Sequence, residues 1–337
     1  MNALEYTRPG LSSRDIIEQA NCFVFKDGYV WAYNDEVATR CKSPLKDITG
    51  AIQAAKLLDI LHKLKEEKLN VRQTKSELRI KGKSKEMGVK MEREISLPIE
   101  DLDYPKKNSK WLELPRKFSD AIQFVEGCAS RDDSKIELTW IHLHPKWVEC
   151  FDNYQLARYR IKLPIDREIS VRQLALKNIV TMTMIEFCVT DNWIHFRNAQ
   201  KQVFSCRIYL DEWKYDLSKI IEKASGRKIT LPKGLLEASE QAKIFSTDAQ
   251  NVTENYIELE LKSDKVIIRG EGQFGWYSSR KKIKYSGEPF KFLIHPHILE
   301  ELVKDHSECE LSEKAMKAQT GKAVFVTALT PPKEKKK

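Results

Sequence analysis

The sequence lacks the features of membrane-spanning, secreted and low-complexity chains. Its 337 residues contain no apolar run near the roughly 20 residues that a transmembrane helix requires. Residues 1–10 show no basic stretch followed by an apolar one, so a secretory signal is not indicated. Glycine and proline number only 13 and 12, which excludes a collagen-like or low-complexity composition. We therefore expect a globular protein of the cytoplasm.

Paired cysteines are lacking as well. The seven cysteines are scattered through apolar segments, and no two of them form a Cys-x-x-Cys pair. An odd number without that spacing is typical of buried thiols in a reducing compartment, rather than of disulfides or a zinc site. These residues are Cys22, Cys41, Cys128, Cys150, Cys188, Cys206 and Cys309.

A metal site or an acid–base site is not indicated either. Two histidine pairs, 142/144 and 295/297, have one residue between their members, but no third ligand follows at a recognisable spacing. The carboxylate pairs at 132/133 and 66/67 stand beside turns or helix ends rich in charge, where a solvated surface is the better interpretation. The sequence predicts no catalytic residue, no metal and no cofactor.

A basic excess is present, and it is spread along the chain. The formal net charge is +9, with +3 over residues 1–108, +2 over 109–226 and +4 over 227–337. The lysine-rich tail, residues 333–337, is expected to be a solvated end. A mild excess in every third favours a polyanionic partner that the whole molecule contacts weakly.

One pattern recurs three times. Val30, Val148 and Val266 stand 118 residues apart, each just after a turn. The turns fall at residues 26–28, 144–146 and 263–265, so each valine is predicted to lie on the return strand of a β-hairpin. The equal spacing indicates an internal repeat.

Helical periodicity accompanies the hairpins. Apolar residues recur at intervals of three and four in five segments, which predicts five amphipathic helices. The segments are residues 54–64, 117–127, 171–180, 234–245 and 295–303. Two short strands are expected at 185–189 and 193–196, with a turn between them.

Polar linkers at residues 103–109 and 224–228 separate the repeats. The prediction is therefore an α+β chain of three similar domains, each with antiparallel sheets and two helices. Their predicted bounds are residues 1–108, 109–226 and 227–337.

One glycine pattern suggests an enzyme. Residues 270–275, GEGQFG, fit the G-x-G-x-x-G fingerprint of phosphate-binding loops. That fingerprint needs a helix N-terminus behind it, whereas residues 276–284 have strand character. A loop between two strands is the preferred interpretation.

Several segments, taken in order, resemble a known family. They are residues 54–61, 97–105, 151–158, 231–246 and 289–302. The segment FDNYQLAR at 151–158 looks like the Asp-Gly-x-Arg-Leu-Ala element of bacterial-type β sliding clamps, the processivity factors of DNA polymerase. Together the segments resemble this family, including versions that phages encode, over most of the chain.

The resemblance implies a non-enzymatic ring. Family members have three domains of similar fold, and two chains close head to tail around duplex DNA, with helices lining the hole. The ring keeps a tethered polymerase at a high effective concentration at the primer end. Expected partners are duplex DNA, the replicative DNA polymerase, a clamp-loader ATPase and a second copy of the chain, without a membrane. The expected location is the nucleoid in the cytoplasm, or the host cytoplasm if a phage encodes the protein.

The resemblance also implies three sites. A pocket for Leu- and Phe-containing peptides maps onto Leu138, Phe151, Asn153, Tyr154, Gln155, Leu156, Ile220, Ile221, Phe325, Thr327 and Leu329. The dimer interface maps onto Met87 and Val89 of one chain and Ile244 and Phe245 of the other. DNA-facing residues, chosen from their expected positions on helices, are Lys56, Lys63, Arg116, Lys117, Arg172, Lys177, Lys233, Lys243 and Lys304.

The chain departs from the family pattern at three places. A lysine tail follows residues 327–330, where family members end in a Met-Pro-Met or Met-Pro-Leu type of sequence. Tyr154 and Gln155 stand where the family favours small, His or Arg residues, which favours a divergent, phage-encoded clamp. Only about eight residues precede Pro9, so the opening strand and helix of the first domain are expected to be truncated.

Two other functions remain as alternatives. One is a nucleic-acid-binding protein that forms no ring, which the distributed charge would also suit. The other, less favoured, is a nucleotide-binding enzyme such as a transferase that uses the loop at 270–275.

Overall fold

The computed structural model describes residues 2–12, 16–45, 47–64, 69–106, 108–246 and 255–332. The chain forms two compact units. Unit 1 consists of Met1–Gln123, Trp140–Lys146 and Lys162–Trp213, and unit 2 of Phe124–Thr139, Trp147–Ile161 and Lys214–Lys337. Each unit therefore contains strands from the middle third of the sequence. The carboxylate pair at 66/67 and the tail at 333–337 lie outside the described residues.

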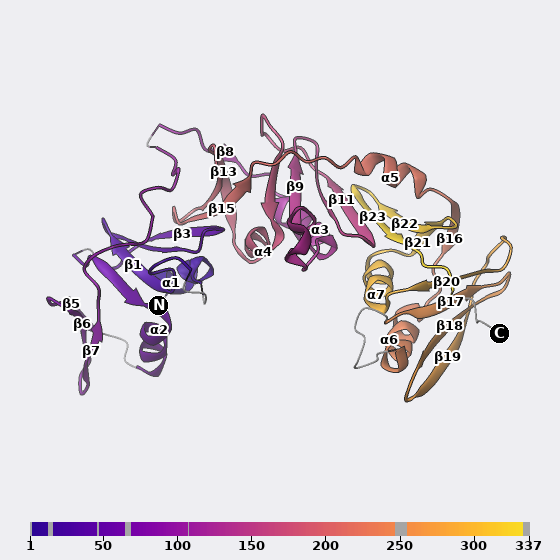
Figure 1. Ribbon diagram of the computed structural model, residues 1–337, viewed down its shortest axis with the longest axis horizontal. Coiled ribbons are helices and arrows are strands. Elements are labelled where there is room, and N and C mark those ends of the chain that lie inside the picture. Colours follow the sequence, from indigo (N-terminus) through magenta and orange to yellow (C-terminus); the bar gives the residue numbers. More distant parts are fainter. Residues whose placement is uncertain are drawn as a thin grey trace. The chain divides into compact units, whose positions relative to one another are not determined.

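Unit 1 is built on an antiparallel sheet with the strand order β9-β12-β15-β3-β2-β1-β4 (Figure 1). Its strands are β1 (Cys22–Lys26), β2 (Tyr29–Tyr33), β3 (Val37–Lys42), β4 (Gly50–Gln53), β9 (Trp140–His144), β12 (Ile169–Arg172) and β15 (Val203–Tyr209). β15 also pairs with β14 (Trp193–Asn198), which pairs with β13 (Met184–Val189), and β13 pairs with β8 (Leu112–Glu113). A separate sheet holds β5 (Asn70–Gln73), β6 (Glu77–Lys81) and β7 (Glu86–Lys90).

The helices of unit 1 cover these sheets with their apolar faces. They are α1 (Asn2–Thr7), which a 3₁₀ turn at Arg8–Gly10 extends, α2 (Ala54–Lys63) and α4 (Gln173–Leu176), which a 3₁₀ turn at Lys177–Thr181 follows. α2 buries Leu57 and Leu58 against Phe23 and Ile52 of the sheet, as its spacing predicts. α3 (Phe118–Val125) belongs to unit 1 up to Gln123 and to unit 2 from Phe124.

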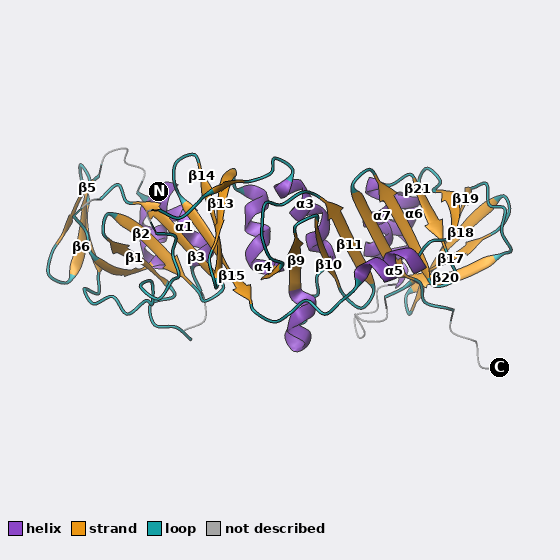
Figure 2. Ribbon diagram, turned by 90° about the horizontal axis from the view of Figure 1, so that it is seen from above, coloured by secondary structure: helices purple, strands orange, loops and turns teal. Residues whose placement is uncertain are grey.

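Unit 2 has two antiparallel sheets. The first has the order β16-β21-β22-β23-β11-β10 and the second the order β19-β18-β17-β20. The strands are β10 (Trp147–Phe151), β11 (Gln155–Arg160), β16 (Arg227–Thr230), β17 (Ile257–Leu261), β18 (Lys265–Gly272), β19 (Gly275–Lys282), β20 (Phe290–Ile294), β21 (Glu308–Leu311), β22 (Ala315–Thr320) and β23 (Ala323–Ala328). α6 (Leu235–Ser246) packs on β18 and lies beside α7 (Pro296–Asp305), while α5 (Leu217–Lys223) precedes β16 (Figure 2). Two 3₁₀ turns, Glu126–Cys128 and Asp133–Thr139, complete the unit.

The predicted repeat is visible in the strands. Val30, Val148 and Val266 are each the second residue of a strand, in β2, β10 and β18, and all three are buried. The turn before β2 is formed by Asp27 and Gly28, with φ values of 51° and 76°, which the type I′ hairpin requires. All five segments predicted to be helical contain helix, although the one at 171–180 forms only α4 and a 3₁₀ turn.

The glycine pattern at 270–275 forms the turn of a hairpin, as predicted from the strand character of the residues that follow it. Gly272 pairs with Gly275 at the turn between β18 and β19. A Cβ atom on Gly270 would stand 2.0 Å from the carbonyl oxygen of Ala242, and one on Gly272 would stand 2.3 Å from that of Phe245. These glycines therefore allow α6 to pack closely on β18.

The seven cysteines are all buried, as predicted. Burial raises the pKa of Cys128, Cys150 and Cys206 far above that of an exposed thiol. Among the helices of the described residues, none is long and apolar enough to span a membrane.

Candidate functional site

An open groove of about 490 Å³ lies within unit 2. It is formed by β10, β11, β22 and β23, by the turns beside them, and by α5 with the residue that follows it. The lining residues are Phe151, Asp152, Asn153, Tyr154, Gln155, Leu156, Ile220, Lys223, Ala224, Ser312, Lys314, Ala315, Val326 and Ala328. Most of the surface is apolar, and the charged groups are one carboxylate and two lysines. Such a surface suits a segment that presents apolar side chains.

The floor of the groove is part of a small hydrophobic core. Leu156 of β11 stands opposite Val326 of β23, and both are buried together with Ala224. Phe151 and Ile221 pack against this cluster from its margin. The floor is therefore set by the pairing of two strands that are far apart in the sequence.

The turn between β10 and β11 shapes one wall. Oδ1 of Asp152 accepts hydrogen bonds from the backbone N–H groups of Tyr154 and Gln155, at 2.7 and 2.9 Å. Burial raises the pKa of the Asp152 carboxyl, and these hydrogen bonds oppose the shift. The turn leaves the side chain of Tyr154 46% exposed, edge-on to His295 at 5.6 Å between ring centroids. The Tyr154 ring is thus an aromatic surface at the groove.

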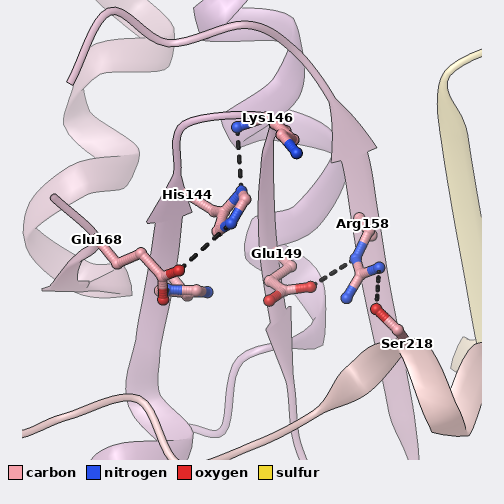
Figure 3. Close-up of polar contacts among 7 residues, drawn as sticks. His144, Lys146, Glu149, Arg158, Glu168 and Ser218 are labelled. Atoms are coloured by element: carbon pink, nitrogen blue, oxygen red, sulfur yellow. Dashed lines mark hydrogen bonds and ion pairs between the residues drawn. The ribbon is translucent and has the colours of Figure 1, made fainter. Parts of the chain in front are cut away.

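A buried ion pair fixes α5, which forms the other wall. Nε of Arg158 lies 2.6 Å from Oε2 of Glu149, and one terminal nitrogen of Arg158 donates to Oγ of Ser218 on α5 at 2.9 Å (Figure 3). The guanidinium also lies 4.4 Å from the centre of the Trp147 ring. Because the Arg158 guanidinium bonds both the Glu149 carboxylate and the Ser218 hydroxyl, its buried charge is compensated and α5 is held against the sheet.

The groove brings together six of the residues predicted for the peptide pocket: Phe151, Asn153, Tyr154, Gln155, Leu156 and Ile220. The remaining five are placed elsewhere. Leu138 and Leu329 are buried, and Ile221 packs into the core. Phe325 and Thr327 are buried on the opposite face of β23, because neighbouring residues of a strand alternate between its two faces.

The strand β23 therefore presents the other set of residues, Val326 and Ala328, to the groove. The residues on the two faces of β23 are largely apolar. The sequence of this strand therefore does not indicate which face lines the groove. Lys223, Ala224, Ser312, Lys314 and Ala315 also line it and were not predicted. They lie at the end of α5, in the turn before β22 and at the first residue of β22, where no sequence motif marked them.

A second cavity, of about 410 Å³, lies in unit 1 and is lined by His142, one member of a histidine pair. Nε2 of His142 lies 3.0 Å from one carboxylate oxygen of Glu168. Nε2 of His144 lies 3.3 Å from the other oxygen (Figure 3). The His142 ring stacks on Trp213 at 4.5 Å. In the described ranges, no group of three or more His, Cys, Asp or Glu side chains is arranged to hold a metal ion.

The residues predicted for the dimer interface lie near two sheet edges. Met87 and Val89 are on β7, the last strand of the three-stranded sheet. Ile244, 72% exposed, and Phe245, stacked on Tyr277, are at the end of α6 beside the edge strand β19. Phe274, in the turn before β19, and Trp276, the second residue of β19, are 83% and 71% exposed and were not predicted. Val89 itself is buried, so the outer surface of β7 comes from its neighbours.

Comparison with known proteins gives matches in structure. No protein-family model matches the sequence, and no curated protein matches it. A putative DNA polymerase III beta subunit from Eubacterium rectale aligns with a TM-score of 0.80 and 13% identity, over 97% of this chain and 96% of that chain. A DNA polymerase III beta chain from Streptococcus pneumoniae aligns with a TM-score of 0.80 and 16% identity, over 98% and 97%. The DNA polymerase sliding clamp of Pseudomonas aeruginosa gives 0.79 and 13%, over 98% and 96%.

The chain has the fold of the bacterial sliding clamps. The match extends over nearly the full length of both chains, so the clamp fold accounts for both units.

In this clamp fold, most of the residues predicted to face DNA are exposed at helices. Lys56 and Lys63 lie on α2, Lys243 on α6 and Lys304 on α7. Lys177 begins a 3₁₀ turn, and Arg116, Lys117 and Lys233 stand one or two residues before helices. All eight side chains are exposed. Lys117 is paired with Asp120 at 2.7 Å, and Lys243 with the buried Glu300 at 3.3 Å.

Arg172 differs from the prediction that placed it on a helix. It is the last residue of β12, where its backbone pairs with Trp140 of β9. Its side chain forms an ion pair with Glu36 and is only 13% exposed. The helical spacing of the segment begins one residue later, and the strand ladder extends through Arg172.

Proposed function

We propose that the protein is a DNA sliding clamp, which encircles duplex DNA and tethers the replicative DNA polymerase. The observation that carries the proposal is the match to clamp structures over 97–98% of the chain. The polymerase III beta subunits that it resembles supply the expected partner. We propose three clamp domains, at residues 1–108, 109–226 and 227–337, with two copies of the chain completing a ring.

The charge of the molecule supports the contact with DNA. The net charge is +9, and eight basic side chains are exposed at or beside helices. Such groups attract phosphates without reading base edges, so the contact is sequence-independent and weakens as salt rises. A loose contact of this kind permits sliding.

The groove in unit 2 supports the contact with polymerase and with a clamp loader. It is apolar, open and lined by the ring of Tyr154 and the side chains of Phe151 and Leu156. Short peptide segments with Leu and Phe side chains fit a surface of this chemistry. The ring could then bind either the polymerase or the clamp loader at this groove, through a short segment of that partner.

The proposed activity is topological, and no catalytic residue is assigned. The one pattern that suggested an enzyme, at 270–275, forms a hairpin whose glycines contact α6. We place the protein with DNA in the cytoplasm, and its Tyr154 and Gln155 favour a phage-encoded clamp in a host cell.

The test is retention on DNA with and without ends. A bacterial clamp loader with ATP places the labelled protein on nicked circular DNA, and gel filtration separates bound from free protein. Cutting the circle once should release the protein, because a ring can then slide off an end. Blocking both ends with bound streptavidin should restore retention. Equal retention on circles and on open linear DNA would instead support a nucleic-acid-binding protein without a ring.

A further inference from the structure

Unit 1 contains a second copy of the strand arrangement that forms the groove. The strands run β22-β23-β11-β10 in unit 2 and β14-β15-β3-β2 in unit 1. One row of paired residues across unit 2 is Val326, Leu156 and Phe151. The matching row across unit 1 is Ser205, Ala38 and Tyr33. The two sets of strands share one register.

The turns that border these strands match as well. In unit 1, Oδ1 of Asn34 accepts hydrogen bonds from the backbone N–H groups of Glu36 and Val37, at 3.2 and 2.8 Å. Asp152 makes the same two bonds in unit 2. Each position that lines the groove on these strands therefore has a counterpart in unit 1.

The counterpart of the groove is filled. Trp193, which is 2% exposed, stands opposite Arg207 in the pairing of β14 with β15. Its indole packs against the Tyr33 ring at 6.0 Å between centroids, and the guanidinium of Arg207 lies 4.9 Å from the centre of the indole. Arg207 also donates to the Tyr33 hydroxyl at 3.1 Å and forms an ion pair with Asp35. Trp193 and Arg207 together form a plug, held on both sides.

In unit 2 the pair at the plug positions is Ala315 and Ala328. Ala315 opens β22 opposite Ala328, as Trp193 opens β14 opposite Arg207. Both alanines line the groove. The volume that an indole and a guanidinium fill in unit 1 is thus left open in unit 2.

The polar partners of the plug are also replaced. Phe151 stands at the position of Tyr33 and lacks its hydroxyl, and Asn153 stands at the position of Asp35 and lacks its charge. Nothing at these two positions would hold a guanidinium as unit 1 does. Four substitutions therefore act in one direction and open the same site.

We propose that Trp193 and Arg207 are an internal plug that closes the copy of the groove in unit 1, and that Ala315 and Ala328 keep the copy in unit 2 open for an aromatic side chain of a partner peptide. The inference rests on the proposed function, which already assigns Leu- and Phe-containing peptides to this groove, and it adds which residues close one copy and keep the other open. Among the described residues, the copy in unit 2 is then the open one.

The occupant follows from the contact that unit 1 makes internally. There an aromatic side chain packs against the Tyr33 ring. In unit 2 the equivalent ring, Phe151, is held edge-on by Tyr215 at 4.5 Å and borders the open volume. A partner's aromatic side chain next to Phe151 would restore the aromatic pair, and such pairs favour edge-to-face or offset geometry. The partner segment is therefore a short apolar peptide with an aromatic residue.

The test transfers the plug to unit 2 by combining Ala315→Trp with Ala328→Arg. Binding is measured by fluorescence anisotropy with a fluorescein-labelled octapeptide that has Leu-Phe at its centre. We expect binding to weaken about tenfold or more, because the new side chains occupy the volume that the Phe would enter. Ala328 is exposed and Ala315 is partly exposed, so the melting temperature should change little. If the double variant does not fold, Ala328→Arg alone gives the same comparison.

The matched control is Ala323→Arg, which makes the same change on β23 outside the groove. This variant should bind the peptide as the wild type does. Replacing Leu-Phe by Ala-Ala in the peptide should abolish binding. If the plugged variant binds with wild-type affinity, the inference is overturned and the proposed groove remains. If the wild type itself does not bind the peptide, the inference and the peptide-binding role are both overturned, whereas the retention test on circles still decides the ring.

Discussion

At the scale of single residues, buried polar groups in unit 1 are matched by partners from distant segments. His195 is fully buried, with Nδ1 2.8 Å from Oγ of Ser205 and Nε2 3.0 Å from the carbonyl oxygen of Asp103. Burial lowers the pKa of His195 to about 4, because the charged form loses its hydration, although the bond to Asp103 opposes the shift. The ring is therefore neutral in the folded state at neutral pH.

This histidine should make stability depend on pH. Its folded pKa lies below the unfolded value near 6.5, so the unfolded chain binds the proton first as the pH falls. The contribution is fully present above pH 6.5 and is lost as the pH falls toward 4. We expect a loss of about 2 kcal/mol in the free energy of unfolding between pH 7.5 and 5.

Urea denaturation at the two pH values measures this loss, and His195→Gln should reduce it. His62→Gln, on the exposed side of α2, is the control and should keep the wild-type dependence. Parallel loss of stability in the wild type and His195→Gln would assign the effect to other groups.

At the scale of elements, close packing of α6 on β18 depends on glycine. Gly270 and Gly272 lie beneath the backbone carbonyls of Ala242 and Phe245. The last turn of α6 carries Ile244, so this packing also sets where that side chain lies. A pattern that looks like a phosphate loop in the sequence thus serves the contact between a helix and a sheet.

Gly270→Ala should therefore destabilise the protein. Its Cβ would stand 2.0 Å from the oxygen of Ala242, so the helix or strand must shift, at a cost of about 1–3 kcal/mol. Thermal unfolding followed by circular dichroism measures the change. Gly127→Ala is the control, because the nearest atoms to its Cβ would be the Glu301 carboxylate at 3.5 Å. If ATP raises the wild-type melting temperature and Gly270→Ala removes that rise, the result would instead support a nucleotide-binding loop at 270–275.

The helices and strands also show how much of the structure could be predicted from the sequence. The three hairpins and five helices followed from local spacing, because apolar periodicity and turn residues act within a few positions. The segment 171–180 was predicted less well: its spacing suits both an α-helix and a 3₁₀ turn, and the strand ladder extends to Arg172. For β23, Phe325 and Val326 are equally apolar, so only pairing with β11 shows which of them lines the groove.

At the scale of the whole molecule, the proposed ring needs two copies of the chain that bind each other. β7 and β19 are edge strands of their sheets, with backbone groups that a second chain could pair with. The β18–β19 hairpin, which contacts α6, exposes Phe274 and Trp276, and the end of α6 exposes Ile244. Exposed aromatic and branched side chains at a sheet edge are typical of an interface.

Ile244→Glu combined with Phe245→Glu should therefore give monomers. Sedimentation equilibrium should show a mass near 39.2 kDa for the variant and twice that for the wild type. Ile244 is 72% exposed, so Ile244→Glu alone should keep the fold and weaken the dimer through an unpaired charge at the interface. Ile185→Glu is the control, because Ile185 is an exposed isoleucine on β13, away from the predicted interface. An unchanged mass would remove Ile244 and Phe245 from the interface.

The sequence by itself determined the elements of this protein, the 118-residue repeat and the burial of its thiols, because these depend on patterns within short segments. Only the tertiary structure decided which residues meet. It pairs β11 with β23, and it places Ala315 and Ala328 where unit 1 has Trp193 and Arg207. The reason is physical: a strand's alternation defines two faces, but packing against distant strands selects the one that is covered and the one that remains open.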